Sequence, residues 1–96
     1  MITNSSSGTN VHEVATGIYR INTPVEFPGG AGAFNFNQYL IADDEPLLFH
    51  TGPRRMFPLV SEAIGKIVPM QRLHYLAFSH FEADECGSLN EFLAVA

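Results

Sequence analysis

The sequence predicts an α/β (α+β) domain built on one mixed β-sheet with covering helices. Short apolar segments bounded by turn residues occupy residues 11–22, 36–41, 47–49 and 73–78, which is typical of strands. A one-sided apolar stripe over residues 57–68 predicts a helix between the last two segments. Strands joined by short turns pair antiparallel, whereas a strand that follows a crossover helix pairs in parallel. We therefore expect both pairings in one sheet, with at least one face covered.

The N-terminus and the cysteine content bear on where the protein works. Residues 1–10 are polar and rich in serine, and we expect them to form a disordered leader. They lack the apolar centre of a secretory signal, and no apolar run reaches the ~20 residues of a membrane helix. The one cysteine, Cys86, excludes an internal disulfide and suits a reducing compartment. We therefore expect a cytoplasmic protein with no membrane partner.

Charge and composition narrow the range of partners. Lys and Arg together number 5 against 10 Asp and Glu, and the net charge is −5. Binding to a phosphate backbone needs clustered basic side chains, so we predict no nucleic-acid partner. Charged residues make up 16% of the sequence, below the roughly 25% of an average soluble protein. This low value indicates that part of the surface is covered.

The first predicted strands precede a glycine-rich stretch. Residues 11–22 alternate loosely between apolar and polar side chains, which predicts one strand or two strands joined at Gly17. We expect Pro24 and Pro28 to end this segment, because proline cannot donate a ladder hydrogen bond. The glycine-rich residues 29–32 lead into the strand-like residues 34–42 and not into a helix, so they are not assigned as a phosphate site.

A hairpin and a helix follow. An acidic run separates the strand-like residues 36–41 and 47–49 and is typical of a solvated turn, so a β-hairpin is predicted. The next segment has Pro58 in its first turn and stops before Pro69, as expected for a helix. Residues 73–78 then predict a buried strand. The acidic run consists of Asp43, Asp44 and Glu45 and is followed by Pro46, and the helical stripe consists of Phe57, Val60, Ile64, Ile67 and Val68.

Three good metal ligands, His80, Glu82 and Asp84, stand at alternate positions directly after the last predicted strand. In an extended segment, alternate side chains project to the same side, so all three can converge on one cation. On a helix they would diverge. Ser88 and Glu91 fit a capping box, so we expect a helix to begin there with both side chains bonded to its first free N–H groups.

One imidazole and two carboxylates form an oxygen-rich donor set that suits iron or manganese better than zinc. Three ligands are half of a two-iron site, which takes on the order of six. We expect His12 and His74 to be surface or core residues, because His74 lies at the opposite end of the strand that leads to the ligands. His50 is balanced between supporting the ligands through a hydrogen bond and being an ordinary strand-end residue. No catalytic residue is assigned.

Residues 78–89 resemble the H-x-E-x-D metal motif of flavodiiron proteins and of related oxygen-binding diiron proteins, which belong to the metallo-β-lactamase-fold superfamily. Residues 37–41 are similar to an early N-x-Y-L-I strand of that family, and residues 47–52 to its following L-I-D-T-G strand. The resemblance covers residues 11–96. It implies a partial metallo-β-lactamase-like domain, the first half of an αββα sandwich.

The resemblance implies that His80 and Glu82 bind one iron and that Asp84 binds a second. The family's later ligands, a His, a bridging Asp and a final His, would lie beyond the end of this sequence. Glu85 stands where a His often follows the Asp, and His50 stands where the superfamily has a strand-end Asp. Both residues are candidates to hold the metal ligands in place without binding the metal themselves. Manganese and zinc are alternative metals, and no FMN site is expected in this chain.

Several functions stay open. The resemblance implies part of a diiron domain that binds or reduces O2 or NO, as a sensor or an oxidoreductase, and that is inactive as this fragment alone. An alternative is a catalytically silent, shortened module that self-associates or binds a partner, because its last helix is apolar and uncapped and its core is thin. A zinc hydrolase is the weaker alternative, since hydrolases prefer His where Glu82 stands. We expect a homo-oligomer or a missing C-terminal half, and whether the chain is an enzyme stays open.

Overall fold

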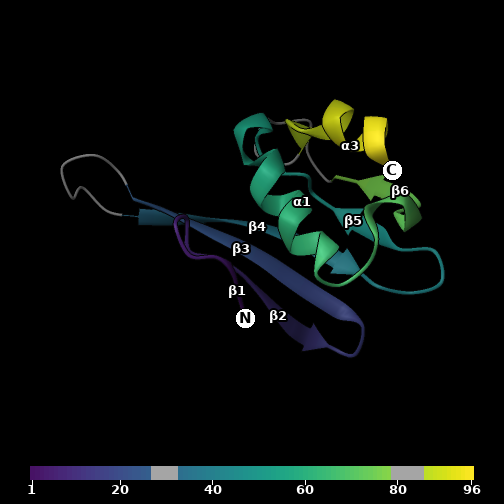
Figure 1. Ribbon diagram of the computed structural model, residues 1–96, viewed down its shortest axis with the longest axis horizontal. Coiled ribbons are helices and arrows are strands. Elements are labelled where there is room, and N and C mark those ends of the chain that lie inside the picture. The colour runs from purple at the N-terminus through teal and green to yellow at the C-terminus, as the bar shows by residue number, and fades with distance from the viewer. Residues whose placement is uncertain (27–32, 79–85) are drawn as a thin grey trace.

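The computed structural model describes residues 1–26, 33–78 and 86–96. Within these residues, six strands form one sheet in which every strand lies beside its neighbour in the sequence (Figure 1). The strands are β1 (Ile2–Asn4), β2 (Thr9–Ala15), β3 (Ile18–Glu26), β4 (Ala33–Ile41), β5 (Leu47–Phe49) and β6 (Tyr75–Ala77). The helices are α1 (Phe57–Gly65) and α3 (Leu89–Val95), with short 3₁₀ turns at Arg54–Met56 and Met70–Arg72. The predicted mixed sheet with covering helices is confirmed.

The direction of each strand follows from the connection that precedes it. Strands β1 to β5 pair antiparallel in sequence order. The hairpin of β4 and β5 is the predicted one, with Leu40 opposite Leu48 and the acidic run between the strands. Strand β6 pairs in parallel with β5, with Leu76 beside Leu48, because α1 carries the chain back across the sheet. The carboxyl ends of β5 and β6 therefore lie at the same edge of the sheet.

The first residues form a hairpin in the structure, whereas a disordered leader was expected over residues 1–10. β1 pairs with β2, and the main chains of Met1 and Val11 bond to each other in both directions, at 2.9 and 2.8 Å. Side chains close the serine-rich turn between them, because the Asn4 carboxamide accepts from the N–H of Ser7 at 3.0 Å. Gly8 completes the turn with φ +78°. The polar composition therefore encodes a turn at the sheet edge.

The segment expected over residues 11–22 is two strands, joined by a turn in which Gly17 has φ +74°. β3 does not stop at Pro24 but continues to Glu26, with Pro24 opposite Asn35 of β4; Pro28, the other residue expected to end it, lies outside the described residues. The antiparallel neighbour β2 does not extend as far as Pro24. Its first residue, Thr9, lies beside Thr23, with the two hydroxyls 2.9 Å apart. Beyond Thr23 the strand pairs with β4 alone, so a proline is tolerated there.

Helix α1 occupies the predicted place but is shorter than its apolar stripe. It begins at Phe57, with Pro58 in the first turn, and ends at Gly65. Ile67 and Val68 follow in a turn whose N–H groups both bond to the carbonyl of Ile64, at 2.8 and 2.9 Å. Their side chains still pack against the core. The stripe therefore predicted the contacts correctly and the end of the helix only roughly.

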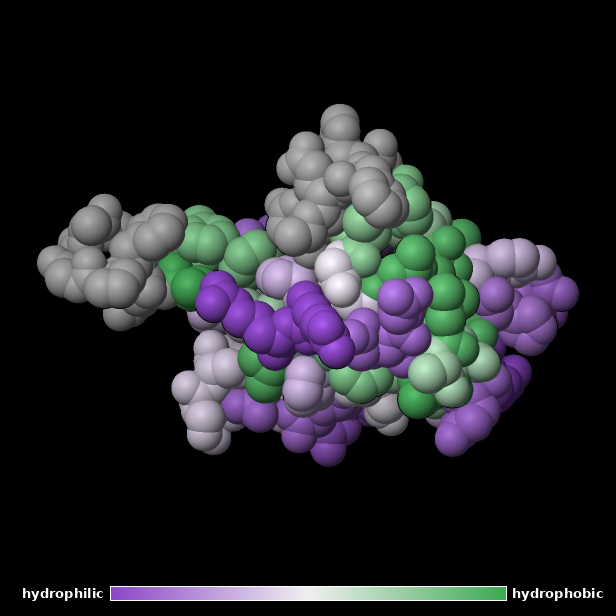
Figure 2. All heavy atoms as spheres, turned by 90° about the horizontal axis from the view of Figure 1, so that it is seen from above, coloured by the Kyte–Doolittle hydropathy of each residue, from purple (hydrophilic) through white to green (hydrophobic). Residues whose placement is uncertain are grey.

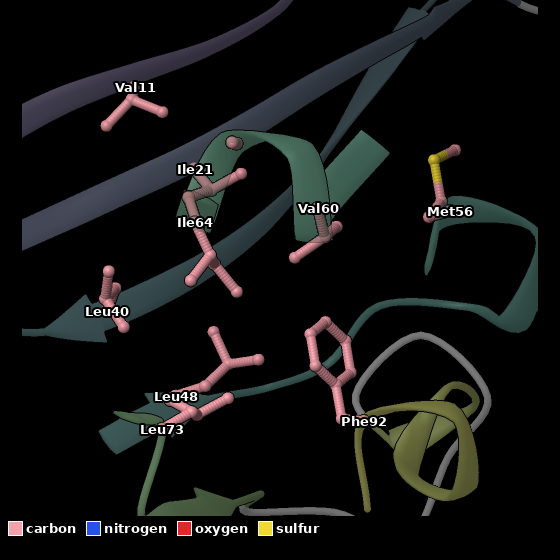
Figure 3. Packing of buried hydrophobic residues seen from close by; sticks show 10 residues of the cluster. Val11, Ile21, Leu40, Leu48, Met56, Val60, Ile64, Leu73 and Phe92 are labelled. Carbon is pink, nitrogen blue, oxygen red and sulfur yellow. The ribbon is translucent and has the colours of Figure 1, made fainter. Parts of the chain in front are cut away.

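The core lies between the helices and one face of the sheet (Figure 3). Val60 and Ile64 of α1 point toward Leu48 of the sheet, and Phe92 of α3 points to the same place from the side. Removing each such side chain from water contributes about 1.5–3 kcal/mol. The core residues are Val11, Ile21, Leu40, Leu48, Met56, Val60, Ala63, Ile64, Leu73 and Phe92.

Both helices lie on the same side of the sheet (Figure 1), and among the described residues no helix covers the other side. We call this other side the open face. Strand β6 forms its edge, and there the prediction of a buried strand is only partly correct: Leu73 is buried but Tyr75 is 51% exposed. The open face consists of Ile18, Arg20, Tyr39, Ile41, Leu47, Phe49 and Tyr75, which lie opposite one another in register and alternate with the buried side chains.

One end of the same side of the sheet is polar. Asn10, Asn22 and Asn37 lie side by side on three neighbouring strands. Asn10 donates to the carboxamide oxygen of Asn22 at 3.2 Å, and Asn22 donates to that of Asn37 at 2.9 Å. This ladder lies next to the apolar part of the open face and marks where the apolar part ends.

In the part of the chain that the structure describes, no helix is long and apolar enough to cross a membrane.

Candidate metal centre

The predicted ligands His80, Glu82 and Asp84, together with Glu85, lie outside the described residues, so their roles remain predictions. Elsewhere, in residues 1–26, 33–78 and 86–96, no group of three His, Cys, Asp or Glu is placed to hold a metal ion. We call residues 78–88, which contain the three predicted ligands, the ligand segment; the structure describes where it starts and where it ends. Both ends meet the loop formed by residues 50–53, which follows β5.

The ligand segment starts at the carboxyl end of β6. Ala77, the last residue of this strand, pairs with Phe49 of β5. The N–H of His50 then donates to the carbonyl of Ala77 at 2.7 Å, which continues the parallel ladder by one bond. The chain therefore leaves the sheet where two parallel strands end together. Open α/β sheets usually bind their ligands at such a place, and the sequence predicted a loop leaving a strand end.

The segment ends at Ser88, which is buried and directly precedes α3. Its hydroxyl donates toward the carbonyls of Gly52 and Pro53, at 2.9 and 3.0 Å, and its N–H lies 3.2 Å from the hydroxyl of Thr51. The Ser88 side chain makes no cap hydrogen bond to α3. The start of the helix was predicted correctly, but the expected capping interaction of Ser88 was wrong, because distant carbonyls take its hydroxyl.

The second half of the predicted capping box also differs from the structure. Glu91 does not reach back to the main chain of Ser88 but forms an ion pair with Arg54, with Oε1 2.7 Å from Nε. The Arg54 side chain is 83% exposed, so water screens most of this attraction. The pair joins α3 to the 3₁₀ turn at Arg54–Met56. Both residues that suggested a local cap therefore make contacts across the fold.

His50 has an unusual backbone conformation. Its φ is +67°, which is uncommon for a residue other than glycine and marks a sharp change of direction after β5. The side chain is half-buried, and its ring lies edge-on to that of Phe49 with centroids 4.2 Å apart. His50 thus stands beside the start of the ligand segment, where a supporting role requires it to be. That role remains a prediction.

The other two histidines lie on the surface, one of the two placements expected for them. His12 is exposed on β2, three strands away from β5 in the sheet. His74 is exposed at the start of β6, and its Nδ1 lies 3.1 Å from the carbonyl of Arg72. Both are therefore suitable control positions for metal binding.

Two further residues beside the site, Gln38 and Thr51, are both fully buried and were not predicted from the sequence. The Gln38 amide fills the space beside Gly52, so that a Cβ on Gly52 would lie 2.9 Å from Nε2. Its Oε1 is buried and has no hydrogen-bond partner among the described residues. The alternation of β4 contains the missing signal, because Gln38 falls in phase with Leu40 and therefore faces inward. For Thr51 the sequence carries no comparable signal.

Solved structures with a similar arrangement include a metallo beta lactamase from Hirschia baltica, with a TM-score of 0.68 and 16% identity, over 90% of this chain and 39% of the other. A mutant of the flavo di-iron protein from Thermotoga maritima has a TM-score of 0.76 and 19% identity, over 91% and 24%. Rubredoxin oxygen:oxidoreductase from Desulfovibrio gigas gives 0.76 and 19%, over 91% and 23%. These likenesses define a protein with part of a metallo-β-lactamase fold.

The sequence itself identifies the family. Residues 34–96, more than half of the chain, match the family model described as ODP family beta lactamase. The chain therefore belongs to the ODP family, and the resemblance predicted from residues 37–41 and 78–89 is confirmed at the level of fold and family. The chain spans 23–39% of the length of the three structures above. A comparison with curated proteins gives no match.

Proposed function

We propose that this chain is the N-terminal portion of a diiron-binding domain that binds or reduces O2 or NO. His80 and Glu82 would hold one iron ion and Asp84 the second, with Glu85 and His50 supporting them. The observation that carries the proposal is that both ends of the segment with these residues are bonded to the loop at 50–53, beside the carboxyl ends of β5 and β6. A ligand-binding loop belongs at this place in the fold.

Two further points support iron. The donor set of one imidazole and two carboxylates is rich in oxygen, which suits iron or manganese. Proteins of similar fold are described as a flavo di-iron protein and as a rubredoxin oxygen:oxidoreductase. When bound, iron supplies the redox chemistry that O2 or NO reduction needs. The chain's own residues bind and orient the metal, and its carboxylates offset part of the metal's charge.

The three ligands in this chain are half of the set that a two-iron site needs. Metal affinity rises with the number of ligands and with the hydrogen bonds that hold them. We therefore expect this chain alone to bind iron weakly and to be inactive as an enzyme, with the remaining ligands supplied by further residues or by another chain. The electron donor and its flavin are likewise expected to come from elsewhere.

Metal analysis tests the proposal. Protein purified without added metal is analysed for iron, manganese and zinc, and is then titrated anaerobically with Fe²⁺ and Co²⁺. In the titration we expect the wild type to bind Fe²⁺ and Co²⁺ weakly but measurably, His80→Ala to lose this binding, and His12→Ala, whose histidine is exposed on β2, to bind as the wild type does. A wild type that binds these ions no more tightly than His80→Ala would overturn the proposal, and zinc retained in the purified protein would favour a zinc hydrolase.

The open face favours a second candidate function, self-association. Ile41 and Tyr75 are 40% and 51% exposed on this face. Figure 2 shows hydrophobic side chains gathered over α3 as well, where Leu93 is 59% exposed. Apolar surfaces of this kind mark sites of protein association. In this candidate function a second copy of the chain covers the open face, and the chain acts as an assembly module without catalysis.

A further inference from the structure

Ser88 holds a concentration of hydrogen bonds that neither a helix cap nor a metal ligand requires. Its hydroxyl lies 2.9, 3.0 and 3.3 Å from the carbonyl oxygens of Gly52, Pro53 and Thr51. Its N–H lies 3.1 Å from the carbonyl of Gly52 and 3.2 Å from the hydroxyl of Thr51. Ser88 and Thr51 are both fully buried. Because water does not compete inside the fold, these bonds fix the position of Ser88 firmly.

The same short loop also holds the other end of the ligand segment. His50, one residue before Thr51, donates its N–H to the carbonyl of Ala77 at 2.7 Å. Residues 50–53 therefore bind Ala77 on one side and Ser88 on the other. The chain between these two residues contains all three predicted ligands. Its ends are thus brought together by one element of the structure, independently of any metal.

The loop at residues 50–53 is itself held in place by buried side chains. Gly52 has φ +80° and packs against the buried Gln38 amide, which leaves no room for a side chain. The Thr51 hydroxyl donates to the carbonyl of Gly52 at 3.2 Å, so it fixes the same peptide group that receives Ser88. Buried side chains on one side and hydrogen bonds on the other make this loop a rigid attachment point. This rigidity is what a positioning element needs.

We propose that Ser88 and Thr51 are positioning residues that clamp the C-terminal end of the ligand segment to the loop at 50–53, whose His50 N–H holds the other end, and so preorganise the segment for metal binding. The inference rests on the proposed function and deepens it. Closing a flexible loop costs conformational entropy, and in this arrangement folding supplies the closure before the metal arrives. The net value of one buried hydrogen bond corresponds to roughly a threefold to tenfold change in affinity.

The test compares four variants of the whole chain. Ser88→Ala removes the hydroxyl, and Asn90→Ala is its control at an exposed site on the same helix. Thr51→Val removes the hydroxyl while keeping the shape, and Thr51→Ser retains it. Two quantities are measured: amide hydrogen exchange of the metal-free protein by NMR, and the affinity for Co²⁺. Urea unfolding of each variant shows whether the fold survives.

We expect Ser88→Ala and Thr51→Val to speed amide exchange at residues 78–88 while leaving β3 and β4 protected. Both should lower Co²⁺ affinity roughly threefold to tenfold. Asn90→Ala and Thr51→Ser should match the wild type in both measurements. If Ser88→Ala fails to fold, the pair at Thr51 gives the same comparison.

If the wild type binds Co²⁺, two outcomes would overturn the inference. Unchanged exchange at residues 78–88 in the folded variants would show that the clamp does not hold the segment. Faster exchange with unchanged Co²⁺ affinity would show that holding the segment does not aid metal binding. A wild type that binds no metal would refute the proposed function and the preorganisation together, and the exchange data would still decide whether the clamp exists.

Discussion

At the scale of single residues, Gly52 shows how closely the loop beside the ligand segment is built. Its φ of +80° lies in the left-handed region, and the amide nitrogen of Gln38 lies 2.9 Å from the place where a Cβ would stand. Gly65 at the end of α1 provides a contrast, because a Cβ there would meet no atom within 4 Å. The two glycines therefore make a matched pair.

We expect Gly52→Ala to lower the free energy of unfolding by at least about 1–2 kcal/mol, which is the cost of the left-handed conformation for alanine. Displacing the Gln38 amide adds to this loss. Gly65→Ala should instead raise the stability by up to about 1 kcal/mol, because alanine favours helix and restricts the unfolded chain. Urea unfolding of both variants measures the difference. Equal effects at the two sites would contradict this explanation of Gly52.

Residue types explain which parts of the site the sequence could predict. The alternate placement of His80, Glu82 and Asp84 is visible in the sequence, and so is the start of a helix after Ser88. The partners of Ser88 and Thr51 are not visible, since 37 positions separate two residues whose local pattern indicates only a cap. Long-range hydrogen bonds of this kind depend on the complete fold. Local patterns therefore predicted a ligand segment but could not predict the hydrogen bonds at its ends.

At the scale of secondary-structure elements, α3 is a short helix that depends on one side chain. Phe92 is fully buried, and its ring lies edge-on to that of Phe57 with centroids 4.9 Å apart. Leu93, the next residue along, is 59% exposed. A helix of 7 residues has little stability of its own, so its position depends on this packing.

Phe92→Ala is expected to destabilise the protein by about 3–5 kcal/mol, through lost burial and the cavity that remains. Leu93→Ala should change the free energy of unfolding by less than about 0.5 kcal/mol, because the side chain is largely in water. Chemical denaturation followed by circular dichroism compares the two. A small effect of Phe92→Ala would mean that α3 is held mainly by its contacts through Ser88 and Glu91.

The presence and type of the helices and strands were predicted better than the residues at which they begin and end. The β4–β5 hairpin and α1 follow from turn residues and from apolar spacing, and both are present. The β1–β2 hairpin was missed because its turn is closed by side chains of Asn4 and Ser7, while its composition is typical of a disordered end. The extension of β3 past Pro24 was missed because it depends on where the neighbouring strand β2 begins. Pairing between strands decides both features.

At the scale of the whole molecule, the open face is the feature that separates the two candidate functions. Helices cover one side of the sheet, and the other side carries apolar residues that end at the asparagine ladder. Ile41 lies on the apolar part of this face, where it is opposite Leu47 of the neighbouring strand. Ile2 is also exposed, but it stands on the far edge strand, opposite Asn10 of the ladder.

If a second copy covers the open face, the wild type should have a molar mass above that of a monomer by light scattering. Ile41→Asp should then shift the protein toward the monomer, because a buried carboxylate without a partner is costly. Ile2→Asp introduces the same charge and should leave the mass unchanged. A wild type that is monomeric at all concentrations would refute self-association.

The strand order has a consequence for how this protein is made. Each strand pairs with the one synthesised just before it, so the first five can add to the sheet one at a time as the chain leaves the ribosome. Only β6 must wait, since its place beside β5 is reached after α1 has crossed over. Each new strand therefore finds its partner strand already synthesised when it emerges, which shortens the time that it spends unpaired.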